Sequence, residues 1–398
     1  MRVVPTISAG DGPVIQGWCP GALRPMQSGD GYVVRVRPRS GRISAAQMAT
    51  IASLARAHGS GLIDFSSRAN IQLRGVTEAS HGPLIEGLRA AGLVDETIAQ
   101  ETTRNIIVTP FWQDGDGTVE LAEELAGLLA EGPSLPAKFG FAVDTGARPV
   151  LTEVSADIRI ERAEDGGLIL RADGADRGIR VNGRDAAAQA VALARWFVAS
   201  GGVTGGRGRM RALLAKGHAL PDAFTCDTPP ASPDLAEEAG PCAGAVEAGF
   251  LVGFAFGQAT AEQLTALADL APAFRITPWR MVLAEGLRQA PATDGLLTGP
   301  SPLARVFACT GAPGCPQALQ PVRPLARALA RHVPEGAVLH VSGCAKGCAH
   351  PGPAAFTLTA TRDGFDLARN ARAGSDPQSR SLDPARLSAD PPALFGTP

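Results

Sequence analysis

The 398-residue chain has no long hydrophobic run and no excess of basic residues. Its most apolar stretch, 186–199, is interrupted by Gln189 and Arg195, so nothing reaches the roughly 18 apolar residues that a spanning helix needs. The formal net charge is −2, whereas nucleic-acid-binding proteins carry a broad basic surface. The chain also begins without an apolar signal segment. We therefore expect a cytoplasmic protein that spans no membrane and binds no nucleic acid.

Nucleotide-binding fingerprints are missing as well. The glycines of 201–206 do not fit G-x-G-x-x-G, and no P-loop is present. If a nicotinamide supplies electrons to this protein, another protein must deliver them. No Ser-His-Asp constellation stands out either, so the sequence gives hydrolysis little support.

Cysteine is scarce, with seven in the chain, but four of the seven are regularly spaced. Cys309 and Cys315 form a C-x5-C pair, and Cys344 and Cys348 form a C-x3-C pair. Both loops are rich in small or turn-forming residues, so the backbone can aim two sulfurs at one point. Four thiolates are the usual ligands of a [4Fe-4S] cluster, which the pattern favours. A structural zinc site and two disulfides are the alternatives, although disulfides need an oxidising compartment.

Other residues near these pairs can also take part in chemistry. His340 and His350 flank the second pair, and His350 is the candidate catalytic residue, as a proton donor or metal ligand. The alternative is a structural histidine in a strand. The remaining cysteines are scattered, as small buried hydrophobes are, and of these Cys19 alone lies in a turn that can line a site.

An internal repeat organises the chain. In the first copy a strand at 32–37 precedes a capping box, Ser44 with Gln47, which opens a helix to about 58. About 216 residues later the same order recurs, with a strand at 251–256 and a capping box formed by Thr260 and Gln263. In both copies a second strand and then an arginine follow, at 62–65 with Arg68 and at 274–277 with Arg280. The order predicts an α+β protein in which a small domain and a larger domain occur twice.

Basic side chains lie beside the predicted strands of the first half. A guanidinium offers a planar fork of donors that fits a carboxylate, so several together suit a ligand with many carboxylates. The candidates are Arg68, Arg74, Arg104 and Lys138. A solvated surface is the alternative for each. A second basic cluster, 207–216, lies in a glycine-rich loop that can close over an anion or face solvent.

These residues resemble motifs of the nitrite/sulfite reductase superfamily, and the resemblance runs over most of the chain. It has the same cysteine spacing, with Arg68, Arg104 and Lys138 in matching motifs. The resemblance implies a duplicated fold of ferredoxin-like half-domains alternating with larger α/β domains. It also implies that the cysteines hold a [4Fe-4S] cluster and that basic residues bind a tetrapyrrole. The resemblance implies that Arg68, Arg104 and Lys138 contact the tetrapyrrole, and we expect Arg74 and Arg280 to contact it as well.

The expected domain order follows from the resemblance and the repeat. It consists of a half-domain, an α/β domain, a linker, a second half-domain, a cluster-binding α/β domain and a loosely ordered tail. Their boundaries are 14–80, 90–225, 226–243, 244–292, 300–372 and 373–398.

Two segments resemble the precorrin-3B synthase family within this superfamily. They are 340–351, which surrounds the second cysteine pair, and 19–31. Sirohaem enzymes usually carry Cys-Pro-Asn at that pair and a second lysine two residues after Lys138, where this chain has Gly140. The resemblance implies an oxidoreductase of aerobic cobalamin biosynthesis, a monooxygenase that uses O2 to hydroxylate C20 of precorrin-3A. It also implies that a γ-lactone forms from the ring A acetate.

The resemblance further implies a non-haem iron, whose ligands cannot be picked out of six histidines. NADH is implied as an indirect electron source, acting through a separate reductase or a ferredoxin-type donor. Two alternatives stay open. One is a sirohaem-dependent sulfite or nitrite reductase, which Gly140 and Lys346 disfavour, and the other is a non-catalytic protein that binds iron-sulfur clusters or tetrapyrroles.

Overall fold

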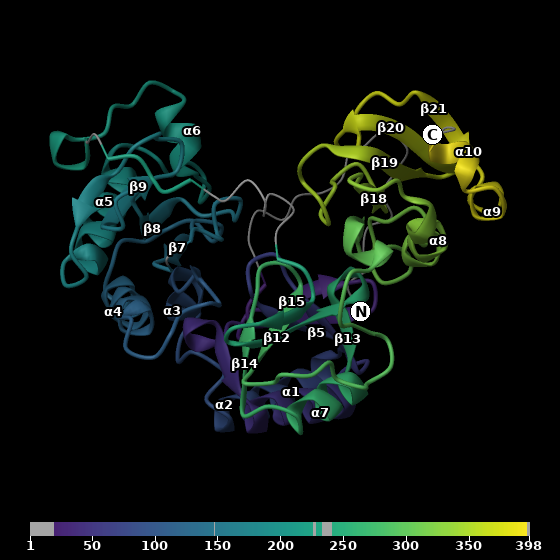
Figure 1. Ribbon diagram of the computed structural model, residues 1–398, viewed down its shortest axis with the longest axis horizontal. Helices are drawn as coiled ribbons and strands as arrows, with labels where there is room; N and C mark the ends of the chain where they lie inside the picture. The colour runs from purple at the N-terminus through teal and green to yellow at the C-terminus, as the bar shows by residue number, and fades with distance from the viewer. Residues whose placement is uncertain (1–19, 147, 226–227, 233–240, 396–398) are drawn as a thin grey trace.

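The computed structural model describes residues 20–146, 148–225, 228–232 and 241–395. Cys19, Cys226 and most of the predicted linker therefore lie outside the described residues. Figure 1 shows a base that contains both copies of the small repeat, with one larger lobe above each side. The first lobe is teal and the second is yellow.

Two antiparallel sheets form the base. The first has the order β1 (Met26–Ser28), β2 (Gly31–Val36), β5 (Ile71–Val76), β4 (Leu62–Phe65) and β13 (Gln258–Thr260). The second has the order β11 (Gly244–Val246), β12 (Gly249–Phe254), β15 (Met281–Glu285), β14 (Ala273–Ile276) and β3 (Arg42–Ser44), with β16 (Leu296–Leu297) pairing with β12. The last strand of each sheet comes from the other copy of the repeat, so the copies have exchanged strands.

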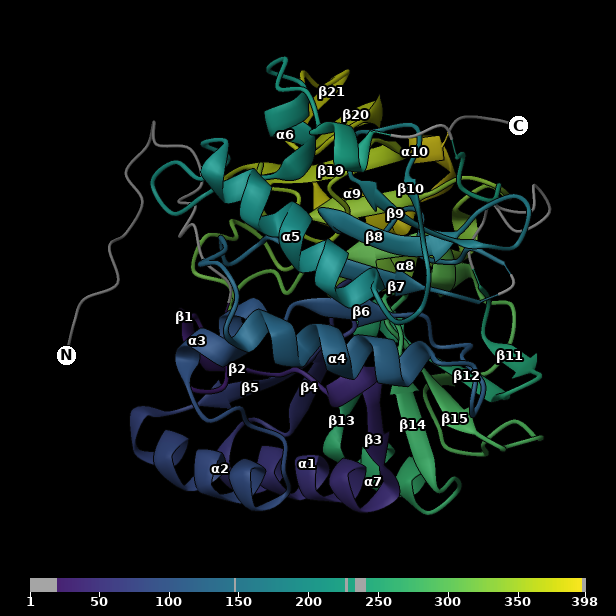
Figure 2. The same ribbon diagram turned by 90° about the vertical axis from the view of Figure 1, so that its left-hand side faces the viewer.

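Each exchanged strand leads directly into a helix. β3 precedes α1 (Ala45–His58), and β13 precedes α7 (Ala261–Ala268). These two helices lie side by side beneath the sheets, next to α2 (Glu78–Ala90) (Figure 2). Buried side chains of both copies, among them Met48 and Leu264, belong to one continuous core. The two copies therefore form a single packing unit.

The predicted capping boxes are confirmed. The side chain of Ser44 accepts the N–H of Gln47, whose side chain in turn accepts the N–H of Ser44. Thr260 and Gln263 make the same reciprocal pair at the start of α7. These two bonds satisfy N–H groups that a helix leaves unpaired at its first turn.

The two arginines expected at matching places are not equivalent, and that part of the prediction is wrong. The N–H of Ser66 donates to the carbonyl of Asn70 at 2.9 Å, and the N–H of Thr277 donates to the carbonyl of Met281 at 3.1 Å. In this alignment Arg280 takes the place of Ala69, and both have left-handed backbones, with φ of 61° and 51°. The two arginines therefore differ by one place in otherwise matching turns, and the counterpart of Arg68 is Trp279.

The two lobes also share a topology, so the duplication includes them. The first sheet runs β6 (Ile106–Val108), β7 (Phe141–Asp144), β8 (Ile158–Arg162), β9 (Leu168–Ala172) and β10 (Ile179–Val181). The second runs β17 (Val306–Ala308), β18 (Leu339–Ser342), β19 (Ala354–Thr361), β20 (Gly364–Ala371) and β21 (Ser379–Leu382). In both sheets the first three strands are parallel and the last two pair antiparallel.

Helices connect and cover the strands of each lobe. In the first lobe they are α3 (Ile98–Thr103), α4 (Thr118–Ala130), α5 (Ala186–Ala199) and α6 (Met210–Leu214). In the second lobe they are α8 (Arg323–Leu329), α9 (Pro384–Ala389) and α10 (Pro392–Phe395). α4 and α8 hold corresponding places, since each connects the first two parallel strands of its sheet.

The residues before α8 form a loop whose Leu319 N–H donates to the carbonyl of Gly343 at 2.8 Å. One expectation for the second lobe is corrected. The tail expected to be loosely ordered from 373 instead completes the lobe, with β21 paired to β20 and two helices after it. Leu387, Leu394 and Phe395 are buried in the core of the lobe, which explains why this segment is ordered.

A buried carboxylate ends β7 in the first lobe. Asp144 is 2% exposed, and its Oδ2 accepts the N–H groups of Val150 and Leu151 at 2.8 and 2.7 Å. Burial raises the pKa of Asp144 to about 6, against the opposing effect of those N–H groups and of Arg159. Since the folded-state pKa lies above the unfolded one, the carboxyl destabilises the fold progressively as the pH rises from about 4 to about 6.

Asp144→Asn is therefore expected to gain stability relative to the wild type as the pH rises. The difference in unfolding free energy should grow by up to about 3 kcal/mol between pH 4 and pH 7, at about 1.4 kcal/mol per pKa unit. Urea denaturation at a series of pH values measures it. Asp116→Asn is the control and should lose stability relative to the wild type as the pH rises. Burial raises the pKa of Asp116, but hydrogen bonds from Gln113 and Thr118 outweigh it and lower the pKa. A constant difference for Asp144→Asn would contradict the expectation.

Candidate functional site

Two of the four spaced cysteines lie where neighbouring parallel strands end. Cys309 directly follows β17, and Cys344 follows β18 after Gly343. Because β17 and β18 pair in parallel, both cysteines lie at the same edge of the sheet. The N–H of Gly343 donates to the Sγ of Cys309 at 3.2 Å. Cys315 and Cys348 lie farther along the same two loops.

Close packing requires glycine at 343. A Cβ there would lie 2.7 Å from the Cβ of Ala318 and 3.3 Å from the Sγ of Cys309. The hydroxyl of Ser342 donates to the carbonyl of Cys344 at 2.7 Å and fixes the start of the second cysteine loop. The two loops therefore hold each other in place at the edge of the sheet.

The four thiols influence one another electrostatically. Burial raises the pKa of Cys344 and of Cys348, and the other three cysteines add to the effect on Cys344. In the part of the chain that the structure describes, however, no three His, Cys, Asp or Glu side chains converge closely enough to hold one ion. Four thiols on two loops that contact each other are a donor set that a [4Fe-4S] cluster uses.

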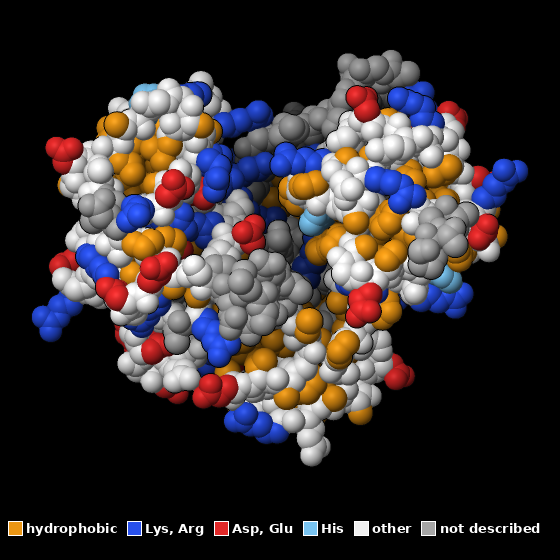
Figure 3. All heavy atoms as spheres, turned by 45° about the horizontal axis from the view of Figure 1, so that its top comes forward, with side chains coloured by type: hydrophobic (Ala, Val, Ile, Leu, Met, Phe, Trp, Pro, Cys, Tyr) orange, Lys and Arg blue, Asp and Glu red, His pale blue; other side chains and the backbone are white. Residues whose placement is uncertain are grey.

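Lys138, with Arg68 bonded to its backbone, comes near the second cysteine pair from the first half of the chain. Arg68 lies in the turn between β4 and β5, and its Nη1 donates to the carbonyl of Lys138 at 3.3 Å. The Lys138 side chain is exposed, and its charge favours the thiolate of Cys348. Figure 3 shows basic side chains gathered around the hollow between the two lobes. The structure therefore brings these two predicted residues together near the second cysteine pair.

Arg280 is part of the contact between the base and the second lobe. It donates a hydrogen bond to the carbonyl of Ala349, and its guanidinium lies 5.0 Å over the ring of Phe307. Burial and the charge of Arg323 lower the pKa of Arg280 to about 10. Arg280 thus supports the loop of the second cysteine pair.

Arg74 is 5% exposed and is paired within the protein. Its guanidinium forms ion pairs with Asp30 at 2.8 Å and with Asp64 at 3.3 Å. Its Nη2 also donates to the carbonyl of Gly314 at 3.1 Å, and the hydroxyl of Ser28 donates to the same oxygen at 2.7 Å. The structure therefore places Arg74 beneath the first cysteine loop, where it fixes the backbone next to Cys315.

The carboxylates that hold Arg74 were not anticipated from the sequence. Asp30, and Ser28 beside it, lie in segment 19–31, which resembles a segment of the precorrin-3B synthase family. That resemblance was the signal that could have found them. Asp64 carried no comparable signal, because a lone acidic residue inside an apolar strand is not distinctive.

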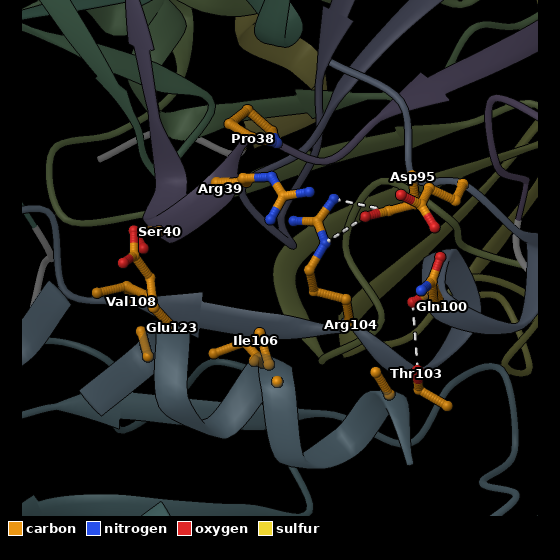
Figure 4. A pocket seen from close by; sticks show the side chains of 15 residues that line it. Pro38, Arg39, Ser40, Asp95, Gln100, Thr103, Arg104, Ile106, Val108 and Glu123 are labelled. Carbon is orange, nitrogen blue, oxygen red and sulfur yellow. Dashed lines mark hydrogen bonds and ion pairs between the residues drawn. The ribbon is translucent and has the colours of Figure 1, made fainter. Parts of the chain in front are cut away.

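Arg104 lines a cavity that none of the other predicted tetrapyrrole contacts lines. Its Nε and Nη2 donate to the carboxylate of Asp95 at 3.0 and 2.8 Å, and Nη2 also donates to the carbonyl of Arg37 at 2.8 Å. In Figure 4 it lines a cavity of about 390 Å³ between α3 and α4, where it faces Arg39. The residues that line this cavity include neither Arg68, Lys138 nor a cysteine.

The two histidines lie beside the second cysteine loop. His340 is fully buried on β18, and neither of its ring nitrogens has a hydrogen-bond partner among the described residues. Burial, with the charges of His350 and Arg280, lowers the pKa of His340 to about 3, so its imidazole is neutral. The ring of His350 lies 5.8 Å from that of His340 and 4.7 Å from that of Phe307. The two rings lie beside the loop, and no third His, Cys, Asp or Glu of the described residues joins them closely enough to hold one ion.

Gly140 occupies a position with no room for a side chain. Its N–H donates to Asp157 at 3.0 Å, and a Cβ would lie 2.7 Å from the Nδ2 of Asn105. That Nδ2 in turn donates to the carbonyl of Phe139 at 2.8 Å. A lysine at this place would have to displace Asn105 from a buried hydrogen bond.

Comparisons with known proteins agree with this architecture. Residues 24–91 match the family described as the nitrite/sulfite reductase ferredoxin-like half domain. A curated precorrin-3B synthase from a Sinorhizobium species is 28% identical over 92% of this chain and 85% of its own length. The solved structure of the NirA protein of Mycobacterium tuberculosis matches with a TM-score of 0.63 at 18% identity, over 90% of this chain and 79% of that one.

The duplicated α+β fold and the resemblance to the nitrite/sulfite reductase superfamily are thereby confirmed. Among the described residues, the helices are all too short or too polar to cross a membrane.

Proposed function

We propose that this chain is a precorrin-3B synthase, an oxidoreductase of cobalamin biosynthesis. In this role it hydroxylates C20 of precorrin-3A with O2 and closes a γ-lactone from the ring A acetate. The observation that carries the proposal is the likeness to a curated precorrin-3B synthase over 92% of the chain. The hollow between the lobes supports it, since the charge of Lys138 acts on Cys348 there and Arg68 contacts the backbone of Lys138, so a polycarboxylate and a redox centre would meet.

The cysteines fit a [4Fe-4S] cluster, with Cys309, Cys315, Cys344 and Cys348 as its ligands. A bound cluster would supply single electrons. The N–H of Gly343 would stabilise the thiolate of Cys309, since hydrogen bonds to sulfur tune such centres. No nucleotide fingerprint is present, so the two electrons of NADH would arrive through a separate reductase or ferredoxin-type donor.

The substrate side of the reaction rests on the chain's own cations. Arg68 and Lys138 would bind carboxylates of precorrin-3A and hold the macrocycle beside the cysteine loops. In the net reaction one oxygen atom of O2 enters the substrate and the other leaves as water, with two electrons taken from NADH.

A mononuclear non-haem iron does not fit the described residues. No three of their His, Cys, Asp or Glu side chains come together, and two-His-one-carboxylate sites need such a group. We therefore assign no step to such an iron.

Gly140 disfavours the rival reading as a sirohaem-dependent sulfite reductase. Those enzymes carry a second lysine at this position, whereas here Gly140 packs against Asn105. Purified protein should accordingly show the broad brown absorption of a cluster. Sharp, intense visible bands would instead indicate sirohaem and contradict the proposal.

The deciding experiment is oxygen uptake with precorrin-3A and a reducing system. We expect uptake that depends on precorrin-3A, and a product that carries one atom of oxygen from ¹⁸O2. The control omits precorrin-3A and should show no uptake above background. Tight binding of precorrin-3A without uptake would support a carrier, and reduction of sulfite or nitrite would support a reductase.

A further inference from the structure

The glycine-rich segment before α6 is fixed in place. Met210 is fully buried and Leu213 is 4% exposed, and both belong to the core of the first lobe. At the tip, Thr204 and Arg207 pair through both of their backbone hydrogen bonds. The segment therefore presents its basic side chains from a defined position.

Arg209, at the start of α6, is oriented by a buried carboxylate. Its Nε donates to Asp157 at 2.9 Å, and Asp157 is fully buried. Asp157 also accepts the N–H groups of Met210 at 2.8 Å and of Gly140 at 3.0 Å. With these bonds the Arg209 guanidinium is held in one orientation, while its side chain remains 34% exposed.

A single hydroxyl joins Arg209 to the cations described above. Nη2 of Arg209 donates to the Oγ of Ser155 at 2.9 Å, and Nη2 of Arg68 reaches the same oxygen at 3.4 Å. Nη1 of Arg68 reaches the carbonyl of Lys138. The guanidinium groups of Arg209 and Arg68 therefore meet at Ser155, and Arg68 also contacts the backbone of Lys138. Asp157, which orients Arg209, is buried and already accepts hydrogen bonds from three donors.

We propose that Arg209 binds a carboxylate of the tetrapyrrole substrate together with Arg68 and Lys138. The outward edge of a guanidinium fixed in this way presents N–H donors that fit a carboxylate. The loss of conformational freedom on binding is small, because Asp157 and Ser155 already orient the group. This inference rests on the proposed function for the identity of the substrate.

The test is a titration of the full-length protein with uroporphyrin III, a stable tetrapyrrole with eight carboxylates, followed by fluorescence. Arg209→Gln should weaken binding roughly tenfold or more, since a hydrogen bond between charged groups is worth about 1.5–3 kcal/mol. Arg211→Gln is the matched control: Arg211 is two residues away, 70% exposed and paired with Asp173 at 3.0 Å. It should change the affinity less than about twofold. Unchanged affinity in a folded Arg209→Gln protein overturns the inference.

In Arg209→Gln the buried Asp157 loses one hydrogen-bond partner. A second variant therefore separates an effect on binding from an effect on folding. Arg209→Lys keeps a positive charge beside Asp157 but loses the planar pair of N–H donors. It should weaken binding by a smaller factor than Arg209→Gln does. With precorrin-3A, both variants should raise KM more than they lower kcat.

The two proposals fail separately. Uroporphyrin binding that depends on Arg209, without precorrin-3A turnover by the wild type, rejects the proposed function and keeps the carboxylate site. Turnover by the wild type, with binding indifferent to Arg209, rejects this inference alone.

Discussion

Replacing Cys344 with serine is expected to abolish both the visible absorbance of the cluster and the turnover of precorrin-3A. Cys344 stands at the shared edge of β17 and β18, where the loops of both cysteine pairs are tied together. A serine hydroxyl is a far weaker acid than a thiol and stays protonated, so it cannot replace a thiolate ligand of iron. One lost ligand would leave the cluster with three.

Iron content, visible absorption and oxygen uptake, measured after the same anaerobic reconstitution, test this expectation. Cys242→Ser is the matched control, because Cys242 is an exposed free cysteine outside the spaced pairs. It should retain iron, absorbance and turnover. Turnover by a Cys344→Ser protein that holds no cluster would remove the cluster from the reaction.

Replacing Arg74 with methionine is expected to lower the free energy of unfolding by about 3–5 kcal/mol, the usual cost of breaking a buried ion pair from one side. Asp64 would be left buried without the Arg74 charge, and Gly314 would lose a hydrogen-bond donor next to Cys315. The variant should therefore also lose iron faster than the wild type during gel filtration. Chemical denaturation and iron analysis measure the two effects.

Arg380→Met is the control for Arg74→Met. Arg380 is 70% exposed and lies 3.7 Å from Asp366, and an exposed pair of this kind is worth less than about 1 kcal/mol. If Arg74→Met is as stable as the wild type but binds uroporphyrin III weakly, Arg74 contacts the tetrapyrrole, as its place among the basic candidates suggested. Its burial and two carboxylate partners favour the structural role.

Local sequence signals predicted the repeat well. The capping boxes at Ser44 and Thr260 depend on residues three apart, so they can be recognised without knowledge of the fold. The spacing of the cysteines within each pair can likewise be recognised from residues close together in the sequence. The exchange of β3 and β13 was not predictable in this way, because each is three residues long and pairs with a strand from the other half of the chain.

The sequence did not reveal which carboxylates the long basic side chains contact. Arg74 and Arg104 are predicted tetrapyrrole contacts, and each forms an ion pair with a carboxylate of the protein. Those partners come from elsewhere in the sequence, as does Asp157 for Arg209. Only the fold decides which carboxylate reaches which arginine.

The ordered C-terminal segment shows a similar limit. Leu387 stands alone and Leu394 and Phe395 are adjacent, among polar residues and prolines, so no periodic pattern marks them. They become ordered because the sheet of the second lobe offers an apolar surface to cover.

The exchanged strands set the order in which the protein can be completed during synthesis. β13, which closes the first sheet, leaves the ribosome long after its partner β4. At roughly 5–20 residues per second, the edge of β4 waits on the order of ten seconds or more for that partner. Such pairings between distant segments give a high contact order and slow folding. During this interval the nascent chain exposes an unpaired strand edge, the kind of surface at which chains aggregate and chaperones act.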